Sequence, residues 1–161
     1  MKETVIDVLM FLFDNYLDFE EGVSEDEASL TWELEEAGFH VKDITKAFDW
    51  LETLAEIKNA KPLMMPMARN SMRVYLPQEI AKLDLACRGF LVQLEEMKLL
   101  DTSTREIIIE RSTAIEVEQL NLKQFKRIVG LVMMNQPGYE EISHWIEELV
   151  YSEENEQAII H

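Results

Sequence analysis

Apolar residues recur at intervals of three and four along most of the chain, which is the spacing of one face of an α-helix and not of a β-strand. The longest such run starts at Pro77, which suits the first position of a helix because its missing N–H would have no partner there. The run continues to about Lys98 and predicts one central helix about 33 Å long, against which other helices pack. Its inward stripe is expected to consist of Ile80, Leu83, Cys87, Phe90, Leu91, Leu94 and Met97.

Three helices are predicted before the central one. The first, from about Met1 or Thr4 to Leu17, is apolar on two sides and is therefore expected to lie between other helices. The second begins at a capping box, in which Ser24 and Glu27 each satisfy a free backbone N–H, and it ends at Gly38. The third follows after a tight turn, so the first part of the chain is expected to contain a helix-turn-helix.

The stretch from Ile57 to Leu76 differs from the helices around it, because it contains two prolines, several basic residues and no acidic one. Met72 to Leu76 alternate weakly in polarity, and we expect them to form a strand that pairs with residues near Ile57. Three helices followed by such a β-hairpin are the plan of a winged-helix domain. The predicted fold is mainly α, with a winged-helix-like lobe over residues 1–76 and a wing loop at 57–76.

The rest of the chain predicts a C-terminal four-helix lobe, residues 77–161, that packs against the first. After the central helix, Ser103 and Glu106 form another capping box. Asn121 and Gln124 open the next helix, and a final helix begins at Tyr139. The acidic tail that follows is expected to fray.

The net charge of −17, from 15 basic and 32 acidic residues, limits the classes of partner. Such a surface repels phosphate backbones and anionic membranes at long range, so basic or neutral protein partners are favoured. The alternative is that the acidity only keeps the protein soluble. No apolar run approaches the roughly 20 residues needed to span a bilayer, and the N-terminus lacks the pattern of a signal peptide.

The chain carries few residues suited to catalysis. Its single cysteine, Cys87, excludes an intramolecular disulfide and fits a reducing compartment. It lies on the apolar stripe with no base in the adjacent sequence, so we interpret it as a core residue and not as a nucleophile. The sequence contains no phosphate-binding glycine loop and no zinc-binding histidine or paired-cysteine motif. It therefore predicts no enzyme activity, no cofactor, no metal and no small-molecule ligand.

The segment 57–76 is the predicted partner-binding site. It carries a charge of +4 while the remainder of the chain carries −21, and its methionines are typical of an adaptable binding surface. The alternative is a mobile loop whose methionines cover the core. The residues expected to bind a partner are Lys58, Lys61, Met64, Met65, Met67, Arg69 and Arg73.

A cluster of charged residues lies within and after the central helix. Asp84 and Arg88, four residues apart, form either part of a polar site or an ion pair that fixes packing, and we favour packing. Gly89 costs about 1 kcal/mol relative to alanine inside a helix, which suggests that another backbone crosses there. The predicted polar packing network consists of Asp84, Arg88, Arg105, Glu106, Glu110 and Arg111.

Several short segments of the sequence, taken together, resemble the motifs of a known protein family. They are Ser71-Met72-Arg73-Val74-Tyr75, Leu83-Asp84 with Cys87-Arg88-Gly89-Phe90-Leu91 and Leu94-Glu95, Arg105-Glu106 with Ile109-Glu110-Arg111, DVLMFLFDNY at 7–16, AGF at 37–39 and DWLETL at 49–54. Together they resemble the bacterial Smg family. Leu76 and His40 depart from the family pattern, where a capping hydroxyl and an Asp are expected. The resemblance implies a cytoplasmic bacterial protein of unassigned biochemical function and supplies no catalytic residues.

Two functions follow as hypotheses. The first is a non-catalytic protein-interaction or adaptor module that binds through the basic loop or an exposed apolar groove. The alternative is a nucleic-acid-associated winged-helix protein that binds through the basic loop. Nucleic acid is the less favoured partner, because the third helix mixes Lys42 and Lys46 with acidic residues and is unsuited to a DNA groove.

Overall fold

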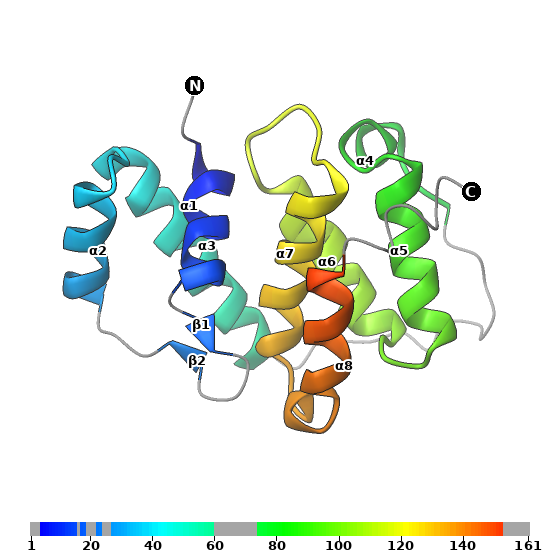
Figure 1. Ribbon diagram of the computed structural model, residues 1–161. Helices are drawn as coiled ribbons and strands as arrows, with labels where there is room; N and C mark the ends of the chain where they lie inside the picture. The colour runs from blue at the N-terminus through cyan, green and yellow to red at the C-terminus, as the bar shows by residue number, and fades with distance from the viewer. Residues whose placement is uncertain (1–3, 16, 19–21, 24–26, 60–73, 153–161) are drawn as a thin grey trace.

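Eight α-helices and one short pair of strands make up the part of the chain that the structure, a computed structural model, describes (Figure 1). That part comprises residues 4–15, 17–18, 22–23, 27–59 and 74–152. In chain order the elements are α1 (Val5–Asn15), β1 (Leu17–Asp18), β2 (Gly22–Val23), α2 (Glu27–Glu36), α3 (Val41–Asn59), α4 (Pro77–Lys82), α5 (Leu85–Glu96), α6 (Thr102–Thr113), α7 (Leu122–Met134) and α8 (Tyr139–Tyr151). The prediction of a mainly α fold is confirmed.

Helix α1 packs against both α3 and α7, as its two apolar sides predict (Figure 1). It buries Ile6, Val8, Leu9, Leu12 and Phe13. The approach to α7 is closest at Gly130, where an added Cβ atom would lie 2.6 Å from Cζ of Phe13. The missing side chain lets the phenyl ring of Phe13 reach the α7 backbone, and α1 thereby joins the N-terminal helices to the C-terminal ones.

Several predicted helix ends coincide with capping groups. At the start of α7, the Gln124 N–H donates to Asn121 Oδ1 at 2.7 Å, and the Asn121 N–H donates to Gln124 Oε1 at 3.1 Å. Helix α2 is followed by Gly38 at φ +104°, in the left-handed region that glycine tolerates. The cap of helix α6 is Asp101, two residues before the predicted cap at Ser103, and its Oδ1 accepts the Thr104 N–H at 2.8 Å.

The predicted central helix is wrong in one respect: it is two helices, α4 and α5. Between them Leu83 is extended, at φ −113° and ψ 107°, and it is buried in a parallel β-bridge with Leu120. Asp84 then opens α5, because its Oδ1 accepts the N–H of Cys87 at 3.0 Å. An aspartate in this position satisfies one of the free N–H groups of a new helix start, which compensates for the interrupted helix.

The prediction of a winged-helix lobe with a short β-hairpin is wrong. Ile57, near which the sequence predicts one strand, lies inside α3, and residues 74–76 do not form a strand. Among the described residues the only paired strands are β1 and β2, which lie between α1 and α2 with Leu17 opposite Val23. The physical reason is that α3 keeps its helical hydrogen bonding to Asn59, so the chain near Ile57 is not extended. Residues 60–73 of the predicted wing loop lie outside the described part.

One cluster of buried apolar side chains runs through the described part, from Ile6 in α1 to Val150 in α8. Helices α7 and α8 pack against each other, and α6 packs on the other side of α7 (Figure 1). The division of the chain into two lobes at residue 76 stays a prediction. None of the described helices is long and apolar enough to cross a membrane.

Candidate protein-interaction surfaces

The six residues of the predicted polar network lie in three separate groups. In the first group, Asp84 caps α5, and Arg88 donates from Nε to the backbone oxygen of Leu83 at 3.0 Å. The guanidinium of Arg88 also lies 5.7 Å from the ring centre of Tyr75. Asp84 and Arg88 therefore hold the junction between α4 and α5 in place.

The second group joins α5 to α6. The guanidinium of Arg105, which is buried, donates to Glu95 at 3.0 Å and to Glu106 at 3.2 Å. A buried guanidinium loses its contacts with water, and the two carboxylates compensate for that loss. An unpaired buried charge would have no such compensation. The contact is consistent with a packing role.

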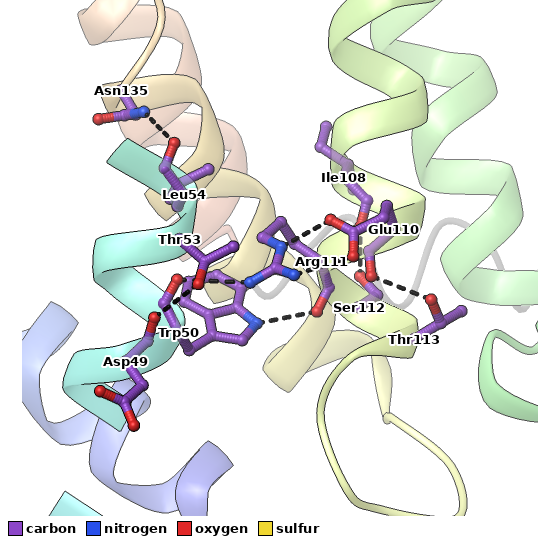
Figure 2. A network of polar contacts seen from close by, with 10 residues as sticks. All are labelled: Asp49, Trp50, Thr53, Leu54, Ile108, Glu110, Arg111, Ser112, Thr113 and Asn135. Atoms are coloured by element: carbon purple, nitrogen blue, oxygen red, sulfur yellow. Dashed lines mark hydrogen bonds and ion pairs between the residues drawn. The ribbon is translucent and has the colours of Figure 1, made fainter. Parts of the chain in front are cut away.

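The third group centres on Arg111 and locks α6 to α3 (Figure 2). The indole N–H of Trp50 donates to the backbone oxygen of Arg111 at 2.9 Å, and Nη1 of Arg111 donates to the backbone oxygen of Trp50 at 3.4 Å. Glu110 accepts from Nε and Nη2 of the same guanidinium at 2.7 and 2.8 Å. One turn after Trp50 in α3, Nδ2 of Asn135 donates to the backbone oxygen of Leu54 at 3.0 Å, so α3 is also tied to the end of α7 (Figure 2).

A cleft of about 230 Å³ lies beside this joint. Its two basic side chains are both engaged, since Arg111 binds Glu110 and Lys46 lies 3.6 Å from Glu116. The cleft is lined by Val5, Lys46, Asp49, Trp50, Thr53, Arg111, Ala114, Ile115 and Glu116. Its charged groups neutralise one another, and the arrangement supports packing more than ligand binding.

The thiol of Cys87 points into the core. It is fully buried and lies 3.6 Å from the backbone oxygen of Leu120. Burial, followed by the negative charge of Asp84, raises the pKa of this thiol well above its usual range. A nucleophilic cysteine needs the opposite shift, because the thiolate is the reactive form.

Several other basic side chains are turned toward the ends of helices. Nζ of Lys82 donates to the backbone oxygens of Thr113, at 3.3 Å, and Ile115, at the end of α6. Nζ of Lys126 donates to the backbone oxygen of Ser152 at 2.8 Å, where α8 ends. These last carbonyls of a helix have no partner within the helix and carry its partial negative charge, so a cation stabilises them.

Arg127 combines both kinds of contact. Its Nε donates to Oδ1 of Asp14 in α1 at 2.8 Å, and its Nη1 donates to the backbone oxygen of Val150 in α8 at 3.2 Å. Arg127 itself is 7% exposed. Its positive charge therefore pairs with groups inside the molecule, as do the charges of Arg105, Arg111 and Lys126. These four charges neutralise little of the outer surface.

The acidic residues, in contrast, lie mostly on the outside, and α8 presents them around an aromatic side chain. Glu141, His144, Trp145 and Glu148 recur at three- and four-residue spacing, so they share one side of the helix, and all are exposed. Trp145 is 54% exposed. We refer to these four residues as the α8 face.

A second surface has no charged residue among its exposed ones. Between Val74 and Val92, every exposed residue is uncharged: Val74, Leu76, Pro77, Gln78, Ile80, Ala81, Leu85, Gly89 and Val92. Glu79 in this stretch is buried, and its Oε1 accepts the N–H of Leu76 at 2.9 Å at the start of α4. The absent capping hydroxyl at Leu76 is thus partly replaced by a carboxylate from within the helix.

The predicted partner-binding residues are not part of these surfaces as described. Lys58 lies in the last turn of α3, and Lys61, Met64, Met65, Met67, Arg69 and Arg73 lie outside the described residues. The sequence analysis did not single out Leu85, Val92 or Trp145. The sequence does carry a signal for them: each is a large apolar residue on the side of its helix opposite the buried stripe.

The fold and its surfaces define a mainly α-helical protein in which several buried arginine and lysine side chains connect the helices. Exposed acids and a few large apolar side chains form much of its outside. No solved structure matches the chain.

Residues 5–161 match the family described as "Protein of unknown function (DUF494)", and the chain belongs to that family. It is 46% identical over 153 residues to a Protein Smg homolog of Nitrosococcus oceani, with 95% of this chain and 96% of the relative covered. It is 40% identical over 158 residues to one from Shewanella sp. strain ANA-3, with 98% and 99% covered. A third, from Xanthomonas oryzae pv. oryzae, is 38% identical over 156 residues, with 97% and 98% covered. The resemblance to the Smg family is confirmed.

Proposed function

We propose that this protein is a non-catalytic interaction module of the cytoplasm that binds a positively charged protein partner through the α8 face. The observation that carries the proposal is Trp145, an exposed indole between Glu141 and Glu148 on the outer side of α8. Tryptophan is enriched among the residues that contribute most to protein interfaces. The carboxylates on either side favour lysine or arginine in whatever covers it.

The distribution of charge supports the same partner class. Lys82, Lys126 and Arg127 bind backbone oxygens at helix ends, so they neutralise little of the surface. A chain with a net charge of −17 attracts basic molecules at long range and repels phosphate backbones. An arginine or lysine from the partner is suited to the face of the Trp145 ring, because the ring attracts cations.

A nucleic-acid partner is not proposed. That hypothesis depends on a winged-helix lobe, which the helical conformation of Ile57 overturns. Binding through the basic loop at 57–76 stays a prediction, and it is compatible with a second contact for the same protein partner.

The proposal is tested by photo-crosslinking in the native cell. A photo-reactive amino acid at position 145 is compared with one at Gln119, an exposed position outside the α8 face. We expect position 145, and not position 119, to crosslink to one dominant protein with an isoelectric point above about 9. Glu141→Lys with Glu148→Lys should abolish that product.

Equal crosslinking from both positions, or a product that survives the double charge reversal, would overturn the proposal. A purified complex adds a second criterion. Because opposite charges are brought together, the Kd should rise with salt concentration.

A further inference from the structure

Helix α2 lies at the edge of the molecule, where it packs on α3 and is well separated from α8 (Figure 1). A hollow of about 540 Å³ opens beside Ala28, Ser29, Trp32 and Glu33 of this helix. The indole of Trp32 is 64% exposed, which is more than the 54% of Trp145. We refer to these four residues as the α2 site.

The carboxylate of Glu33 is the polar group of the α2 site. Its Oε2 atom is buried and has no hydrogen-bond partner among the described residues. A carboxylate oxygen that is shielded from water and receives no donor costs free energy. Because water screens such a charge less, it attracts a nearby cation more strongly than an exposed carboxylate does. The α2 site therefore favours a cationic ligand.

The other charges of α2 act in the same direction. The helix contains four glutamates and neither lysine nor arginine. Three of the glutamates, Glu33, Glu35 and Glu36, lie in the last turn, where the partial negative charge of the helix already disfavours acids. This arrangement destabilises the free helix, and a bound cation offsets the effect.

We infer that the α2 site binds an arginine side chain of a protein partner. A guanidinium is planar, so one face can stack on the indole of Trp32 while its edge donates hydrogen bonds to the carboxylate of Glu33. The short side chains of Ala28 and Ser29 leave room beside the indole. The compact ammonium of a lysine matches a carboxylate but does not stack on a ring.

Other occupants fit the site less well. An apolar segment would cover the ring of Trp32, but it would leave the carboxylate of Glu33 more deeply buried and still unpaired. A phosphate group would be repelled by the glutamates of the last turn. The α2 site and the α8 face are on different helices, so this inference does not depend on the proposed function.

The test is an NMR titration of the full, isotope-labelled chain with N-acetyl-arginine methylamide. The chain has three tryptophans, and each gives one indole N–H signal. We expect the signal of Trp32 to shift and to saturate with a Kd below about 10 mM, and that of buried Trp50 to stay in place. The citrulline analogue, which has the same shape without the charge, should leave Trp32 unshifted. The lysine analogue should bind at least about 3-fold more weakly.

Two glutamine substitutions separate a specific carboxylate from general negative charge. Glu33→Gln should weaken binding of the arginine probe by at least about 10-fold, because the charge-assisted hydrogen bond is lost. Glu35→Gln is the matched control. It removes the same charge from the same turn, but Glu35 is exposed and lies two positions from Glu33, on another side of the helix. It should change the Kd by less than about 2-fold.

The position of the Trp50 signal in both variants reports whether the fold is intact, since this indole is buried and bonded to Arg111. An unshifted Trp32, equal shifts with arginine and citrulline, a lysine analogue that binds as tightly as arginine, or equal effects of the two substitutions would each contradict the inference. A shift of Trp145 alone would also contradict it, and would leave the proposed function standing.

Discussion

Gly130 and Gly89 both lie inside helices, but their surroundings differ. A Cβ atom at Gly130 would meet the Phe13 ring at 2.6 Å, whereas one at Gly89 would meet no atom of the described residues within 4 Å. Phe13 is 1% exposed, so its ring has little space into which it can move. The two glycines therefore provide a matched pair in which helix propensity is the same and packing is not.

We expect Gly130→Ala to lower the free energy of unfolding by about 1–3 kcal/mol, since overpacking a dense core outweighs the gain in helix propensity. Gly89→Ala should raise it by up to about 1 kcal/mol. Urea denaturation of dilute protein measures both. If Gly130→Ala were as stable as the wild type, the contact between α1 and α7 would be looser than the structure indicates.

Tyr151 links α8 to α1, and its ionisation makes the free energy of unfolding depend on pH in alkaline solution. Its hydroxyl donates to Oδ1 of Asp14 at 3.3 Å, and the guanidinium of Arg127 lies 4.5 Å from its ring centre. Burial, and then the charge of Asp14, raise the pKa of Tyr151 from 10.0 to about 12. The folded protein therefore keeps a proton that the unfolded chain loses within this range.

It follows that the contribution of Tyr151 to stability is complete below pH 10 and is lost as the pH rises toward about 12. Tyr151→Phe has no ionisable hydroxyl, so its stability should fall less steeply over the same range. Urea midpoints between pH 9 and the pKa of about 12 compare the two proteins. Parallel curves would show that the phenol is equally acidic in the folded and unfolded chains.

At the scale of elements, the joint between α3 and α6 depends on a reciprocal contact. Trp50 donates to the backbone of Arg111, and Arg111 donates to the backbone of Trp50 (Figure 2). The guanidinium also lies 5.6 Å from the ring centre of Trp50. This joint fixes α3 on the C-terminal helices by hydrogen bonds as well as by apolar packing.

Trp50→Phe keeps an aromatic ring but removes the indole N–H. We expect it to cost about 1–3 kcal/mol, because the backbone oxygen of Arg111 loses its donor in a buried site. Trp145→Phe, the same change at an exposed position, should stay within about 0.5 kcal/mol of the wild type. Thermal or urea unfolding compares them, and equal effects would argue against a specific role for the indole hydrogen bond.

Helix periodicity predicted most of the described helices, but it did not predict the break between α4 and α5. Leu83 and Cys87 are four residues apart and both are buried, so the apolar pattern passes through the break unchanged. What interrupts the helix is a pairing of Leu83 with Leu120, and a contact across 37 positions leaves no local trace in the sequence. Asp84 was visible as a capping residue but was interpreted as one partner of an ion pair.

The candidate surfaces were harder to predict than the helices, for a related reason. Sequence periodicity separates the buried stripe of α5 from its other side, but whether another helix covers that other side depends on tertiary packing. Leu85 and Val92 became notable only because no described element covers them. The predicted site at 57–76 was based on charge and composition, and it stays a prediction.

At the scale of the whole molecule, the interior and the surface carry opposite charges. Arg105, Arg111, Lys126 and Arg127 are buried among carbonyls and carboxylates, and the net charge is −17. The exposed carboxylates repel one another in the folded protein more than in the expanded unfolded chain, and salt screens that repulsion.

We therefore expect the Tm to rise when NaCl increases from about 10 mM to about 150 mM. The buried ion pairs change little, because salt screens them much less than exposed charges. Differential scanning calorimetry at one low protein concentration measures the effect without a contribution from association. A Tm that falls over this range would mean that attractive surface pairs outweigh the repulsion.

The two lysines that close helix ends have one more consequence. Lys82 and Lys126 bind backbone oxygens, which do not take up protons in mildly acidic solution. Acid that neutralises the outer carboxylates therefore leaves the hydrogen bonds of these two lysines intact. Near the isoelectric point of about 4.5, the protein should come out of solution as a folded precipitate that redissolves when the buffer is returned to neutrality.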